Sequence, residues 1–122
     1  MKKSFLILLA AFGIASALVS PDLEARLTRA APDEYLPVQV VLKAQFDPEL
    51  LNSLVDGMPR PQRRAQVARI LEEFSSREQA GLLELLAGRC AQSIRPLWIV
   101  NAVSCEATPE LVRLVAARPD VA

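Results

Sequence analysis

The chain has 122 residues, a length that suits a single domain. Its hydrophobic content of 52% and charged content of 23% are those of a globular protein and exclude an intrinsically disordered one. The 14 basic and 14 acidic residues balance to a formal net charge of 0, so no basic excess points to a nucleic-acid partner.

The N-terminus has the pattern of a secretory signal peptide. Lys2 and Lys3 precede an apolar run over residues 5–19, and small residues at 15–17 offer a cleavage site. The alternative is a membrane anchor, but the run is shorter than the roughly 20 apolar residues that span a bilayer. We therefore assign residues 1–20 to a signal peptide, and we expect a secreted or periplasmic protein that keeps no stable membrane anchor after cleavage.

The first strand is predicted over residues 36–43. The preceding residues 21–34 contain two prolines and no clear periodicity, so we expect a linker there. In residues 36–43 the β-branched side chains favour a strand. Val40 and Leu42 share one face of this strand, and Val41 lies on the other.

A long helical segment follows the first strand. Asp47 is placed to cap a short helix, and residues 57–61 then interrupt the pattern with Gly and Pro. Over residues 62–88 apolar side chains recur at helical spacing, and the final glycine would end the helix. Ser75 and Ser76 start two overlapping capping boxes, so the sequence leaves open either one kinked helix or two helices in succession.

The C-terminal part reads as strand, corner, strand and helix. Residues 94–100 form the second strand, which should lie at a sheet edge because Pro96 has no N–H for a ladder. Residues 101–102 turn the chain, since Asn tolerates the left-handed conformation. Residues 103–107 form the third strand, and Thr108 caps the last helix.

We therefore expect an α+β fold, a ferredoxin-like β-α-β-β-α-β sandwich with a long helical segment after the first strand. The last strand would begin near Val121, where the sequence ends. We expect that strand to be truncated and the domain, residues 35–122, to be a fragment.

The composition excludes most catalytic chemistry. The sequence has no histidine, which removes Ser-His-Asp and Cys-His catalysis and His-ligated metal sites. The four glycines are scattered and form no phosphate-binding loop. Cys90 and Cys105 make a weak case for a metal, and we expect their Cα atoms to lie beyond the ~7 Å limit for a disulfide. We predict no catalytic residue, no metal and no cofactor, and a protein that is not an enzyme.

The strands carry apolar side chains on both faces. Val41, Trp98 and Val100 lie opposite the apolar residues that would face the core. Since the helices of such a fold cover one face only, the other face would expose an apolar patch, which usually marks a partner site. The alternative is that residues 23–27 fold over this face.

These residues resemble the propeptide of subtilisin-like serine proteases, and most closely that of secreted subtilases of the bacillopeptidase F type. The resemblance covers residues 35–122, and its most specific part is the block from Val100-Asn101-Ala102 to Pro119-x-Val121. The other segments that carry it are residues 38–43, Gln62-Arg63-Arg64, Gln79, Leu82-Leu83-Glu84-Leu85-Leu86 and residues 97–102.

The resemblance implies an exported domain that acts as an intramolecular chaperone and temporary inhibitor of a subtilisin-like protease domain, in cis or in trans. The parent protein would be a serine endopeptidase and this domain its non-catalytic part. The resemblance also implies that the open sheet face docks on the protease, with Val41, Trp98, Val100, Asn101 and Ala102 at or beside the contact. Two alternatives stay open: a stand-alone secreted inhibitor of the same fold, and a periplasmic binding module unrelated to proteases.

Overall fold

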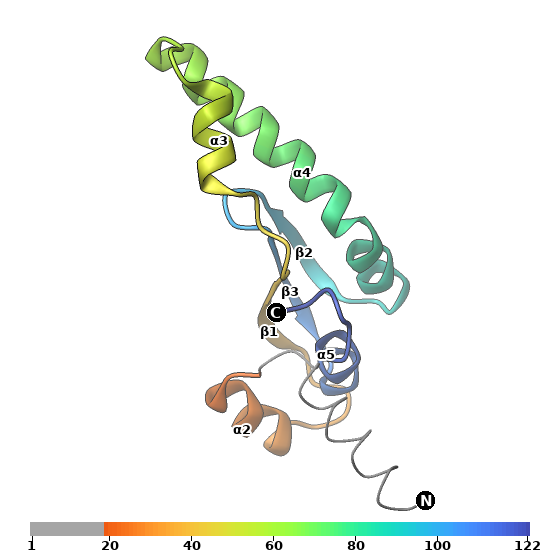
Figure 1. The fold of residues 1–122 in the computed structure, drawn as a ribbon. Coiled ribbons are helices and arrows are strands. Elements are labelled where there is room, and N and C mark those ends of the chain that lie inside the picture. Colours follow the sequence, from red (N-terminus) through yellow and green to blue (C-terminus); the bar gives the residue numbers. More distant parts are fainter. Residues whose placement is uncertain (1–18) are drawn as a thin grey trace, which may run out of the picture.

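The computed structural model describes residues 19–122 and has the mixed helices and strands of an α+β fold (Figure 1). The predicted signal peptide, residues 1–20, lies outside the described residues except for its last two. The elements in chain order are α2 (Pro21–Arg29), β1 (Leu36–Val41), α3 (Pro48–Val55), α4 (Arg60–Gly88), β2 (Gln92–Leu97), β3 (Ala102–Ala107) and α5 (Pro109–Ala116).

β3 is the central strand of a three-stranded antiparallel sheet with the order β1-β3-β2. β1 pairs with β3 so that Val40 lies opposite Val103. β2 lies at the edge, which confirms the prediction from Pro96. After α5 the chain returns to the other side of β1, where Val121 forms an isolated antiparallel bridge with Leu42.

Helices α4 and α5 pack on one face of the sheet. Strand alternation puts Val40 and Val103 on this inner face, where both are buried. From α4, Leu82 and Leu86 reach them and are completely buried. The buried core comprises Leu27, Leu36, Val40, Leu42, Leu82, Leu86, Val103, Cys105, Ala107, Leu111, Val112, Val115 and Val121.

Two helix starts confirm the predicted caps. The Asp47 carboxylate accepts a hydrogen bond from the N–H of Glu49 at 3.0 Å, at the start of α3. The Thr108 hydroxyl accepts one from the N–H of Leu111 at 3.5 Å, at the start of α5. In both helices a proline occupies the first turn, where a missing N–H costs nothing.

The lead-in before β1 is not the linker that the sequence predicts, because Pro21–Arg29 forms α2. The Ser20 hydroxyl caps this helix by accepting from the N–H of Leu23 at 3.2 Å. Leu27 is buried in the core, and Glu24 binds Arg113 of α5 through both carboxylate oxygens. A nine-residue helix is marginal alone, so these tertiary contacts stabilise it.

The segment from residue 60 to residue 88 is one helix, not two, and with α3 it forms a hairpin that extends beyond the sheet (Figure 1). Ser75 does not cap a new helix. Its side chain is buried, and its hydroxyl donates to the carbonyl of Glu72 at 3.2 Å, inside the continuous helix. At the base of the hairpin Phe46 and Phe74 make an edge-to-face contact with ring centroids 5.4 Å apart.

The C-terminus of α4 involves Cys90 as well as Gly88, the glycine that the sequence predicts as the stop. Gly88 is the last helical residue, but the left-handed residue beyond the end is Cys90, with φ of 62°. The N–H of Cys90 donates to the carbonyl of Ala87, and the N–H of Ala91 donates to that of Leu86. This pair of bonds is a Schellman motif, in which glycine usually takes the left-handed position.

The corner between the last two strands is longer than predicted. The sequence predicts a strand over residues 94–100 and a corner at residues 101–102. In the structure β2 ends at Leu97, residues 98–101 form the turn, and Ala102 already belongs to β3. The expectation that the residues after Leu97 continue the strand with two alternating faces is therefore wrong. The ladder closes there because side chains from other elements hold the end of the turn.

Candidate functional site

The turn between β2 and β3 exposes three apolar side chains. Trp98 is 36% exposed, Ile99 73% and Val100 48%. Val41 of β1 is 37% exposed and lies opposite Ala102, the residue that follows the turn. We call Val41, Trp98, Ile99 and Val100 the apolar turn patch. Leu50 and Leu54 of α3, each 48% exposed, are the other large apolar side chains exposed on the hairpin.

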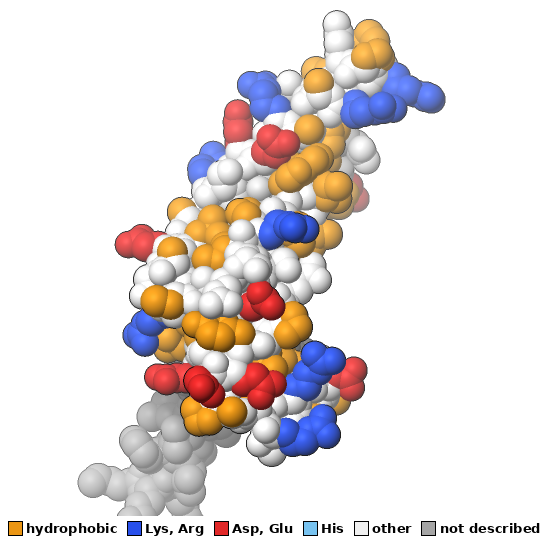
Figure 2. Space-filling view, turned by 180° about the vertical axis from the view of Figure 1, so that it is seen from behind, with side chains coloured by type: hydrophobic (Ala, Val, Ile, Leu, Met, Phe, Trp, Pro, Cys, Tyr) orange, Lys and Arg blue, Asp and Glu red, His pale blue; other side chains and the backbone are white. Residues whose placement is uncertain are grey.

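Away from the turn, the outer face of the sheet is polar rather than apolar. Alternation from Val41 places Gln39 on this face of β1, and Ser104 lies opposite it on β3. Arg95 of β2 lies on the far side of Ser104, and Glu106 accepts a hydrogen bond from Ser93 at 2.8 Å. Within the described sheet, the large exposed apolar side chains therefore gather at the end that carries the turn. Figure 2 shows hydrophobic and charged side chains interspersed along the rear of the molecule.

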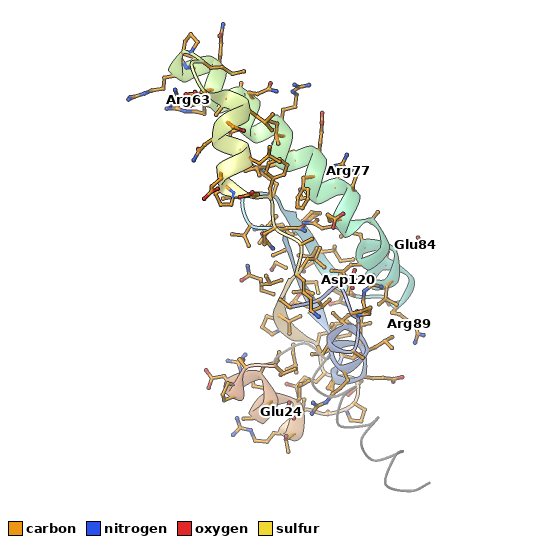
Figure 3. The ribbon with its side chains drawn as sticks, viewed as in Figure 1. Glu24, Arg63, Arg77, Glu84, Arg89 and Asp120 are labelled. Carbon is orange, nitrogen blue, oxygen red and sulfur yellow. The ribbon has the colours of Figure 1, made fainter. Side chains whose placement is uncertain are left out.

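The alternative cover for this face, residues 23–27, packs elsewhere. Leu23 and Leu27 of α2 both join the core cluster, on the side of α5. In Figure 3 Glu24 of α2 lies at the end of the molecule opposite Arg63, which marks the tip of the hairpin. The side chains of the turn patch are 36–73% exposed, so α2 does not bury this patch.

Asn101 and Ala102, two of the predicted docking residues, are buried. Asn101 is 2% exposed and Ala102 0%, so neither side chain is available to a partner. The N–H of Asn101 donates to Gln45 Oε1 at 2.9 Å, and its Nδ2 donates to the carbonyl of Ala44 at 2.8 Å. Its Oδ1 accepts from Nε2 of Gln79 at 2.9 Å. Asn101 thus joins the turn to α4 and to the β1–α3 connection.

Gln79 and Gln45 complete this network, which the sequence alone did not reveal. Gln79 is 1% exposed, and its Nε2 also donates to the carbonyls of Leu97 at 2.7 Å and Ala102 at 3.1 Å. Gln45 Nε2 donates to the carbonyls of Leu42 at 2.8 Å and Asn101 at 3.1 Å. Gln45 itself is exposed, but Gln79 and Asn101 are buried, and buried polar groups that are satisfied in this way fix one geometry. The network therefore holds both ends of the turn that carries the exposed side chains.

A signal for Gln79 was present in the helical spacing. Ser75, Gln79, Leu82 and Leu86 follow one another at steps of three or four residues, and all four are buried on one face of α4. A polar residue within a buried stripe needs a hydrogen-bonding partner. That partner, Asn101, is distant in sequence, which is why the pattern alone did not identify it.

The two cysteines lie in different surroundings. Cys90 is exposed at the end of α4, whereas Cys105 is buried in the middle of β3, and both are free thiols. Burial, with a smaller contribution from the charge of Glu106, raises the pKa of the Cys105 thiol. This thiol therefore stays protonated at neutral pH and is a poor nucleophile.

The described residues contain no cluster of metal-ligating side chains. Over residues 19–122 no three Cys, Asp or Glu side chains come together as a metal-binding group. None of the helices in this range combines the length and the apolar character needed to span a membrane.

Comparisons with protein-family models, with curated proteins and with solved structures find no match to this chain.

Proposed function

We propose that this chain is an exported prodomain-type domain that binds a subtilisin-like serine protease, assists its folding and inhibits it temporarily. In this proposal the domain is itself non-catalytic. The fold would be the ferredoxin-like sandwich. The antiparallel bridge between Val121 and Leu42 supports this finer assignment, because a fourth strand in that place would give the sheet the order β4-β1-β3-β2.

The observation that carries the proposal is the apolar turn patch. Trp98 and Val100 are exposed although they are apolar, and buried amides hold the turn that bears them. Large aromatic side chains that are fixed before binding are typical anchors of protein interfaces, because little conformational entropy is lost on docking. Val41, at the same end of the sheet, would border the contact.

Binding at this patch would act on protease folding by mass action. A ligand that binds only the folded form stabilises that form in proportion to its concentration and affinity. Proteins with many non-local contacts fold slowly, so a surface that stabilises their late, compact states would speed recovery. The same complex would inhibit the folded enzyme as long as the domain stays bound.

A refolding assay tests the proposal. The purified chain is added to a denatured subtilisin-like protease during refolding, and both recovered activity and inhibition of the folded enzyme are measured. We expect the chain to raise the recovered activity and to inhibit the folded enzyme. If the chain changes neither quantity, this form of the domain does not have the proposed function.

A pair of matched substitutions locates the contact. Trp98→Ser removes the proposed anchor and should weaken inhibition about thirtyfold, which corresponds to an interface hot spot. Leu114→Ser is the control, because Leu114 on α5 is 38% exposed against 36% for Trp98. Inhibition that falls equally in both variants would show that the turn patch is not the docking surface.

A further inference from the structure

A pocket of about 330 Å³ lies between α4 and the end of β2, which lie side by side (Figure 1). Its lining includes, from α4, Glu72, Ser76 and Gln79 and, from the strand end and the turn, Leu97 and Trp98. The hydrogen bond from Gln79 Nε2 to the carbonyl of Leu97, at 2.7 Å, joins the two walls. The volume lies at the small end of the roughly 300–1,000 Å³ of ligand-binding pockets, so the pocket suits a single small group.

Glu72 gives this pocket a negative charge that its lining does not balance. None of the described residues that line the pocket is basic. Arg69, one turn before Glu72 on α4, lies 4.0 Å from the carboxylate of Glu73 instead. None of the ion pairs within residues 19–122 involves Glu72. The pocket therefore favours a cation over an anion.

Gln79 brings a hydrogen-bond acceptor to the same pocket. Its Nε2 donates all of the hydrogen bonds of this side chain within the described residues, and none of them ends on its Oε1. Every fully enclosed side-chain oxygen and nitrogen in this part of the chain has a partner, so Oε1 is not sealed inside the protein. The side chain is only 1% exposed and lines this pocket, which is therefore the space that Oε1 reaches. A donor that enters the pocket can bind to it.

The indole of Trp98 supplies an aromatic wall. Tryptophan attracts cations to the face of its ring, and guanidinium groups also stack on that face. A guanidinium group is flat, charged and carries five N–H donors, so it matches the ring, the Glu72 carboxylate and Gln79 Oε1 together. A lysine ammonium group has the charge without the flat face, and an aliphatic side chain would leave both acceptors without a donor.

We propose that this pocket binds the guanidinium group of an arginine side chain on a partner protein. Glu72 and Oε1 of Gln79 accept its hydrogen bonds, and the ring of Trp98 covers one of its faces. The source is a side chain rather than free arginine, because Trp98 also belongs to the apolar turn patch and makes the pocket continuous with a surface that suits a protein. The inference goes beyond the proposed function, because the partner need not be a protease.

A titration of the isotope-labelled full chain with acetyl-arginine methylamide, followed by NMR, tests the site. Trp98 is the only tryptophan in the sequence, so its indole N–H gives a single identifiable signal. The side-chain amide of Gln79 gives a second one. We expect both signals to shift saturably, with half-saturation at about 1–10 mM for a ligand of this size. The absence of a saturable shift up to about 50 mM would overturn the proposal.

A matched pair of variants identifies the charge that binds. Glu72→Gln keeps the size of the side chain and removes its charge, so it should weaken binding at least about threefold. Glu78→Gln is the control, because Glu78 lies on the same helix and is not among the lining residues, and it should bind within about 1.5-fold of the parent. Equal affinities of the two variants would rule out Glu72 as the acceptor and overturn the site.

Three further probes identify the group and its source. Acetyl-citrulline methylamide has nearly the same shape without the charge and should bind at least about threefold more weakly. The Nα-acetyl-lysine methylamide should also bind at least about threefold more weakly, and affinity equal to that of the arginine probe for either compound would overturn the choice of guanidinium. Free arginine that binds about tenfold more tightly than the blocked probe would assign the pocket to the amino acid and refute the protein partner. Since these titrations contain no protease, their failure and that of the refolding assay are distinguishable.

Discussion

Replacing Gln79 with leucine tests whether the buried amide network holds the turn. Leucine has a similar size and helix propensity, so Gln79→Leu removes the hydrogen bonds with little change in shape. The substitution removes Nε2 of Gln79, which donates to Asn101 Oδ1 at 2.9 Å and to the carbonyls of Leu97 and Ala102 at the ends of β2 and β3. Asn101 and Ala102 are buried and Leu97 is half-buried, so water does not readily replace the lost donor.

The expected cost follows from the groups left without partners. A buried polar atom that loses its only partner costs about 1–3 kcal/mol, and carbonyls that keep a second partner cost less. Leucine regains part of the loss through its own apolar burial. We therefore expect Gln79→Leu to lower the free energy of unfolding by about 2–3 kcal/mol. A small domain with a stability of about 5–15 kcal/mol would remain folded.

Urea unfolding measures this loss, and Gln66→Leu is the matched control. Gln66 lies on the same helix, and its side chain accepts a hydrogen bond from Arg69 Nε at 3.3 Å near the surface. The control should change stability by no more than about 0.5 kcal/mol. A Gln79→Leu cost within that range of the control would refute the network as a source of rigidity.

Three further predictions concern other parts of the chain. Cys90→Gly should raise the free energy of unfolding by about 1 kcal/mol, because glycine adopts the left-handed φ of 62° at this position with little strain. The melting temperature should then rise by about 4 °C, and an unchanged melting temperature would contradict the prediction. Arg113→Gln should speed amide exchange in α2 without a large change in global stability, because it breaks the bidentate ion pair with Glu24. The control is Arg69→Gln, which breaks the exposed ion pair with Glu73 and should leave amide exchange in α2 unchanged. The hydrogen bonds from Arg118 lower the pKa of Asp120 in the folded state. The Asp120 carboxylate therefore stabilises the fold at pH values above its unfolded pKa of about 4. This stabilisation is lost as the pH falls through the lower pKa of the folded state. Asp120→Asn should therefore be less stable than the parent at pH 7, with a difference that shrinks at pH 2.5; a constant difference would rule out this linkage.

Local signals in the sequence predicted the elements that local chemistry determines. The caps at Asp47 and Thr108 act on N–H groups two or three residues away, so their patterns predicted α3 and α5 correctly. The edge position of β2 followed from the missing N–H of Pro96. Helix α2 was missed although Ser20 and Pro21 form a local start signal of the same kind. The contacts that stabilise this short helix, made by Leu27 and Glu24, have partners far along the chain that the local sequence does not show.

The turn between β2 and β3 also shows that contacts between distant residues limit prediction from local sequence. Alternation predicted that Trp98 and Val100 would lie on the outer face of a strand, and they are exposed, but in a turn. The difference arises at Asn101, whose side chain bonds to Ala44 and Gln79 and so ends the ladder early. Predicting this would require knowing that a helix residue 22 positions earlier faces the same point in the core.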